Sequence, residues 1–165
     1  ELRSVLKPAS RTLQWKRIVA ALSDAGDGSG SDAGGALRQA ATLVKRRGMV
    51  VLVSDLLMEH AEVDAAVRIL RAQGHDVTVL HLLDPVERSF AVPVGEALFV
   101  DPESGTSLAA TPAEVREAYA STVVEAMDEW RALFAASGAF YEPVLTNEPF
   151  GIPLRRAFAR RQRQF

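Results

Sequence analysis

The sequence contains no cysteine, which excludes disulfides, thiolate chemistry and cysteine-ligated metals. It also lacks a P-loop, a Gly-x-Ser-x-Gly nucleophile elbow and any apolar run close to the roughly 18–20 residues that cross a bilayer. A formal net charge of −2 gives no bias toward nucleic acid or anionic membranes. No signal peptide is visible and the chain begins at Glu1, so we expect a cytoplasmic piece of a longer protein, with any membrane anchor in segments absent from this chain.

What is present is the composition of an ordinary globular domain. Of the 165 residues, 48% are hydrophobic and 24% are charged, which suits one domain over residues 1–165. Residues 1–10 are expected to be irregular, and the Gly/Ser-rich stretch 25–35 to form a flexible loop. Apolar residues with helical spacing predict helices at about 12–24, from a cap at Ser31 or Asp32 to residue 47, at 61–73 and at 111–136, and a last helix that opens at Pro153.

Two apolar, β-branched segments each end on an aspartate. Residues 49–54 precede Asp55, and residues 77–83 precede Asp84. Nearly continuous apolar strands are typical of parallel sheets that helices cover on both faces, and the helix between these two makes a right-handed βαβ unit. With a further strand at 140–145 and a small hairpin of 97–100 with 106–109, the pattern predicts an α/β, Rossmann-like, mostly parallel sheet flanked by helices, with a β-hairpin insertion.

The strand-end residues are the candidate site, because ligands bind at the carboxyl edge of open parallel sheets. Asp55 follows Ser54, and carboxylate and hydroxyl oxygens suit Mg²⁺ or Mn²⁺. The alternative is a turn residue that accepts hydrogen bonds from backbone amides. Asp84 stands before Pro85, which favours a turn over direct metal ligation. Thr146 ends the last strand at the same edge, although such residues most often solvate a loop.

Three other patterns point to function less well. Gly28–Ala33 matches a relaxed Gly-x-Gly-x-x-Ala nucleotide pattern, but a helical segment precedes it where a strand is required. The three histidines share no metal-ligand spacing, and His81 in its apolar strand is more typical of a hydrogen-bonded core histidine. The arginines of the last helix allow a nucleic-acid partner, but a solvated face is favoured and we expect no nucleic-acid binding. No residue is predicted to be catalytic.

Several motifs in a fixed order carry a family resemblance over about residues 36–163. They are Val50–Leu57, Leu83–Glu87, Asp101–Gly105, Ala118-Tyr119 and Thr146–Pro149. In these the chain resembles the C-terminal half of the von Willebrand factor A-like proteins known as domain-of-unknown-function family 58. The resemblance implies a sheet whose first strands lie upstream of this chain.

The same resemblance implies a place for a metal and a kind of partner. Asp55 matches the metal-site aspartate that follows a later strand of von Willebrand A domains, and Ser31 or Asp32 lies where the family has its threonine loop. The Asp-x-Ser-x-Ser motif of that site is absent, so a Mg²⁺ or Mn²⁺ site would be incomplete here. The implied function is a non-enzymatic protein-interaction domain that acts with a MoxR-type AAA+ ATPase. The alternative is a metal-assisted phosphohydrolase that uses Asp55 and Asp84.

Overall fold

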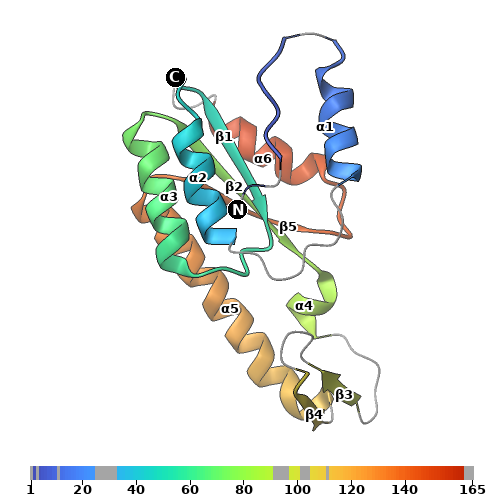
Figure 1. Ribbon diagram of the computed structural model, residues 1–165. Coiled ribbons are helices and arrows are strands. Elements are labelled where there is room, and N and C mark those ends of the chain that lie inside the picture. The colour runs from blue at the N-terminus through green and yellow to red at the C-terminus, as the bar shows by residue number, and fades with distance from the viewer. Residues whose placement is uncertain are drawn as a thin grey trace.

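The computed structural model describes residues 2, 4–10, 12–24, 33–90, 97–100, 105–110 and 112–161. Its centre is a parallel sheet of three strands in the order β1-β2-β5, which are β1 (Met49–Ser54), β2 (Asp76–Leu83) and β5 (Phe140–Leu145). One face of the sheet packs against three helices, which are α2 (Ala33–Leu43), α3 (His60–Ala72) and α5 (Pro112–Ala136). The other face carries α6 (Gly151–Arg161), as Figure 1 shows. The predicted α/β, Rossmann-like architecture is therefore confirmed.

The bounds of most predicted elements agree with the structure to within a few residues. β1 and β5 have the predicted bounds, and β2 begins one residue earlier, at Asp76. The predicted hairpin is present as antiparallel strands β3 (Ala97–Val100) and β4 (Ser107–Ala110), far from the sheet beside the start of α5 (Figure 1). The last helix begins at Gly151, which leaves Pro153 inside its first turn, where a missing N–H costs nothing. Within the described part of the chain, no helix is long and apolar enough to cross a membrane.

The main core lies between the sheet and the helices α2, α3 and α5. Its centre is a run of aromatic rings, with Phe134 stacked between Trp130 and Tyr141 at centroid distances of 5.5 and 5.6 Å. Phe134 is fully buried, and Val63 and Val79 pack in the same cluster. Because Trp130 and Phe134 lie one helical turn apart on α5, the helix fixes the position of the sheet through one aromatic stripe.

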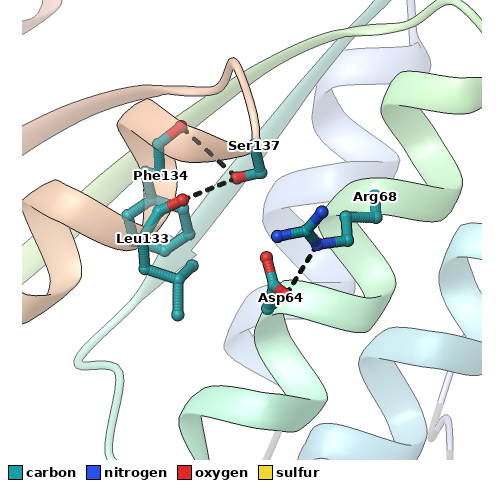
Figure 2. Close-up of polar contacts among 5 residues, drawn as sticks. All are labelled: Asp64, Arg68, Leu133, Phe134 and Ser137. Atoms are coloured by element: carbon teal, nitrogen blue, oxygen red, sulfur yellow. Dashed lines mark hydrogen bonds and ion pairs between the residues drawn. The ribbon is translucent and has the colours of Figure 1, made fainter.

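Polar contacts support the helices around this core (Figure 2). The Ser137 hydroxyl donates to the carbonyls of Leu133 and Phe134, at 3.0 and 3.3 Å, and so satisfies groups that the end of α5 leaves without helical partners. On α3, Arg68 and Asp64 form an ion pair of 2.6 Å at i, i+4 spacing. The arginine is largely exposed, so we attribute little stability to this pair.

On the opposite face of the sheet, the predicted burial of β1 is wrong. β1 was expected to be covered on both faces, but its residues alternate, and Met49, Val51 and Val53 are exposed at 37, 38 and 55%. The reason is the placement of α6, whose Leu154 and Ala157 pack on β2 and β5. Among the described residues, β1 therefore has an apolar face that no helix covers.

The first helix is also uncovered. α1 (Gln14–Ser23) forms where helical spacing predicts it, and its apolar stripe consists of Trp15, Ile18, Val19 and Leu22. All four side chains are exposed, and no residue of α1 is buried. The helical prediction is confirmed, but in the described chain the stripe contributes nothing to the core.

Candidate functional site

The three strands bring their carboxyl ends to one edge of the sheet. Ser54 of β1 pairs with His81 of β2, and Leu83 of β2 pairs with Leu145 of β5. The Thr146 N–H then donates to the Leu83 carbonyl at 3.0 Å, so the ladder extends one residue past β5. Asp55, Asp84 and Thr146 therefore leave their strands at the same edge, as the sequence predicts.

Asp55 is exposed and lies in a compact turn of hydrogen bonds. Its Oδ1 accepts from the Leu57 N–H at 3.2 Å and from the Ser54 hydroxyl at 3.4 Å. The Ser54 oxygen in turn accepts from the Leu56 N–H at 3.0 Å. Asp55 therefore acts as a turn residue that accepts a hydrogen bond from a backbone amide, and it does so with only one of its two carboxylate oxygens. In the described chain, the hydrogen bonds of this turn reach only Oδ1, and the residue as a whole is exposed.

The residue after Asp55 has an unusual backbone conformation. Leu56 has a φ of 57°, in the left-handed region that costs a non-glycine residue on the order of 1–2 kcal/mol. Its side chain is only 3% exposed and packs in the main core, which holds the turn in this conformation. The neighbouring Leu57 is 82% exposed as a consequence. Such strain is characteristic of functional loops, and here it presents Asp55 and Leu57 to the solvent.

A buried histidine ties this turn to the core. His81 Nε2 lies 3.0 Å from the Asp55 carbonyl oxygen, and Nδ1 lies 2.7 Å from the Tyr141 hydroxyl. A carbonyl can only accept, so Nε2 carries the proton and the tyrosine hydroxyl donates to Nδ1. Burial lowers the pKa of His81, although the bond to the Asp55 carbonyl and the charges of Asp55 and Glu87 oppose this. A neutral imidazole therefore fixes the Asp55 backbone, which confirms the predicted hydrogen-bonded core histidine.

A cavity of about 200 Å³ opens beside Asp55, between the sheet edge, α4 (Pro85–Ser89) and α5. Its walls are mainly apolar, with Leu57 and Met127 among them, and its polar groups include Asp55, Glu87 and Tyr119. Burial, reinforced by the charge of Glu87, raises the pKa of Tyr119 and keeps its hydroxyl neutral. The cavity thus offers an apolar pocket with two carboxylates and a phenol among its lining groups.

Asp84, at the same edge, caps a short helix. It is the N-cap of α4, a short helix that the sequence did not predict, and its carboxylate accepts from the Val86 N–H at 2.7 Å. The Glu87 carboxylate returns the contact by accepting from the Asp84 N–H at 3.1 Å, which completes a capping box. This geometry matches the turn interpretation of Asp84 rather than a metal ligand.

The comparison with protein families agrees with the motifs in the sequence. Residues 4–129 match the family described as "Protein of unknown function DUF58". The chain belongs to the DUF58 family. The match spans most of the chain, from before α1 into α5. No characterised protein and no solved structure gives a significant match to this chain.

The described residues of this DUF58 chain do not form a metal site by themselves. They contain no group of three or more histidine, aspartate or glutamate side chains that could hold a metal ion. Mg²⁺ takes six oxygens in near-ideal octahedral geometry, and Asp55 provides at most two. Ser31 and Asp32, the other predicted ligands, lie outside the described residues. Thr146 is exposed at the end of the ladder. Asp55 alone therefore does not account for a Mg²⁺ site, and its role as a ligand stays a prediction.

Sequence reasoning missed three residues of this edge. Glu87 lines the cavity and closes the capping box, and a glutamate three residues after an aspartate was the available indication. Tyr119 was predicted to face inward on α5 but was not assigned to the site, although it belongs to a family motif. Tyr141 gave no local indication, because its partner His81 is 60 positions away.

Proposed function

We propose that this DUF58 chain is a non-enzymatic protein-interaction domain that binds its partner at the carboxyl edge of the sheet. The observation that carries the proposal is the Asp55 turn, in which a strained, core-anchored backbone presents a carboxylate and an apolar side chain beside an open cavity. A rigid turn of this kind loses little conformational freedom on binding. An apolar side chain of the partner would fill the cavity, with Leu57 as part of the contact surface.

A divalent cation, Mg²⁺ or Mn²⁺, is part of this proposal. The Asp55 Oδ2 atom would be one ligand, and hard oxygen donors of this type are the ones these ions prefer. The ligands that the described residues lack would come from residues beyond the described ones, with Ser31 and Asp32 as the candidates in the sequence, and from a carboxylate of the partner. The ion would then link the two proteins, because neither alone completes its coordination.

The partner that the family resemblance implies is a MoxR-type AAA+ ATPase. The choice rests on the resemblance to the family, and the edge described above would be the place where such a protein docks. The direct check is a pull-down of the ATPase from the same cell by the full-length protein, with and without a chelator. If Asp55→Ala captures the ATPase as well as the wild type does, the ATPase binds at another surface of the protein.

Calorimetric titration of Mg²⁺ into the full-length protein tests the role of Asp55. We expect Asp55→Ala to weaken Mg²⁺ binding by about tenfold or more. Loss of a residue that only supports the ligands of a metal site already lowers the affinity by about 10–100-fold, and loss of a ligand should lower it at least as much. Asp84→Asn is the matched control at the same edge and should leave the affinity within about twofold, because that carboxylate caps α4. Equal affinity in the wild type and Asp55→Ala would remove Asp55 from the site.

The phosphohydrolase alternative has a different outcome in the same variants. It needs Asp55 and Asp84 together at one ion, whereas the Asp84 carboxylate already accepts from the Val86 amide. A phosphatase screen with Mg²⁺ and Mn²⁺ distinguishes the two functions. Turnover that is lost in both Asp55→Ala and Asp84→Asn would replace the interaction proposal.

A further inference from the structure

A larger cleft, of about 550 Å³, lies along β5 between α5 and α6. Five consecutive residues, 139–143, line it, together with Arg131 and Ala135 of α5 and Arg156 and Ala159 of α6. Side chains of a strand alternate between the two faces of a sheet, so consecutive lining residues mean that β5 presents its outer edge to the cleft. We call this the β5-edge cleft. It is distinct from the Asp55 cavity.

The backbone of β5 shows which main-chain groups face the cleft. The Thr146 N–H donates to Leu83 of β2, and alternate residues of a strand point their main-chain groups to the same side. The main-chain groups of Tyr141, Pro143 and Leu145 therefore point away from β2, toward the outer edge. Pro143 agrees with this direction, since a proline has no N–H to give to a ladder and belongs on the open side of an edge strand.

The charged side chains of the β5-edge cleft are mainly positive. Arg131 stands on the α5 side and Arg156 on the α6 side, and more than half of each side chain is exposed. One buried carboxylate, Glu142, faces them, and its contact with Arg156 is long, at 3.4 Å. Arg131 contacts Asp128 on its own helix. The sequence of α6 contains no acidic residue that would offset the charge of Arg156.

We propose that the β5-edge cleft binds an extended acidic segment of a partner protein. The outer edge of β5 offers main-chain hydrogen bonds at Tyr141, which an extended polypeptide uses and a small anion does not. Pro143 removes a donor and prevents a long ladder, so the two arginines supply the remaining contacts as charge-assisted bonds to carboxylates. The small side chains of Ala135 and Ala159 leave the space that the segment occupies. This site goes beyond the proposed function, which uses a different edge of the sheet.

Fluorescence anisotropy with a short fluorescein-labelled peptide of alternating glutamate and valine tests the inference. We expect salt-sensitive binding that Arg131→Gln and Arg156→Gln each weaken about tenfold or more, since a hydrogen bond to a charged group contributes about 1.5–3 kcal/mol. Arg155→Gln is the matched control, because Arg155 neighbours Arg156 on α6 but does not line the cleft. It should change the affinity by less than about twofold. In the NMR spectrum, the Tyr141 amide should shift on binding.

Several results would overturn the inference. One is the absence of any binding of the acidic peptide, and another is a loss of affinity in Arg155→Gln equal to that in the two cleft variants. Equal affinity for a lysine–valine peptide would show that the cleft does not select for negative charge. Equal affinity for a single-stranded oligonucleotide would show that the surface binds polyanions in general. Arg131 also lies over the Tyr141 ring, at 6.0 Å, so Arg131→Lys serves as a second variant that keeps the charge. Asp55→Ala should bind the peptide as the wild type does, so that failure here and failure of the proposed function are separate results.

Discussion

Replacing Tyr141 by phenylalanine removes one oxygen atom from the contact that supports the candidate site. The Tyr141 hydroxyl donates to His81 Nδ1 at 2.7 Å, and the histidine is buried. Without the hydroxyl, the ring nitrogen remains a buried acceptor with no donor, which costs about 1–3 kcal/mol. We therefore expect the free energy of unfolding of Tyr141→Phe to fall by that amount, with the aromatic stack on Phe134 retained.

Urea denaturation at pH 7.5 measures this loss as a lower midpoint at an unchanged slope. Burial raises the pKa of Tyr141 to about 12, so the hydroxyl is protonated across the neutral range and the loss should not vary between pH 7 and pH 9. Tyr119→Phe is the control. The Tyr119 hydroxyl has no hydrogen bond in the described chain, and its removal should change stability by less than about 0.5 kcal/mol.

A double-mutant cycle separates the hydrogen bond from the packing of the two rings. His81→Leu removes the acceptor, so Tyr141→Phe should cost little in that background, with a coupling energy within about 0.5–3 kcal/mol. Additive effects would show that the two groups do not interact. A loss in Tyr141→Phe no larger than that in Tyr119→Phe would refute the assignment of the tyrosine as the donor.

Three further predictions concern acid stability, the core and α4. The fold lowers the pKa of His81 from 6.5, so the contribution of His81 to the free energy of unfolding is complete above pH 6.5 and is lost as the pH falls below that value. In urea titrations, the wild type should therefore be more stable than His81→Gln by a margin that shrinks as the pH is lowered below 6.5. Phe134→Ala should lower the free energy of unfolding by about 3–5 kcal/mol, measured by the same method, because the side chain is fully buried. Asp84→Ala should weaken the first turn of α4 by about 0.5–2 kcal/mol, seen as faster hydrogen exchange of the Val86 amide.

The strands and long helices could be predicted because their patterns are local. Residues 49–54 form an apolar run bounded by turn residues, residues 140–145 follow the glycine that ends the long helix, and both strands have the predicted bounds. The short helix α4 could not be predicted in this way, since Pro85–Ser89 covers little more than one helical turn and shows no periodicity. Asp84, Pro85 and Glu87 fit both a turn and a capping box, and the backbone after Asp84 decides for the second.

The candidate site was predictable in position but not in detail. Strand ends alone placed Asp55 at the sheet edge. Its support depends on contacts between distant residues, because the parallel register pairs His81 with Pro143 and so brings Tyr141, two residues earlier on the same face, to the imidazole. The left-handed conformation of Leu56 had no sequence indication either, because glycine is the usual residue there.

The two edges of the sheet differ in a way that bears on both proposals. The edge at β5 carries Pro143 and two arginines, which are features that prevent indiscriminate strand pairing. At the other edge, the Gly48 carbonyl bonds to the Asp76 N–H of β2, so the main-chain groups of Val51 and Val53 point outward by alternation, and their side chains are exposed as well. No proline or charged residue interrupts β1. Among the described residues, no strand pairs with this edge of β1, and an apolar strand that is open at its edge and on one face is unfavourable in water. Strand addition is therefore favoured at β1 over β5, where Pro143 removes a donor from the ladder.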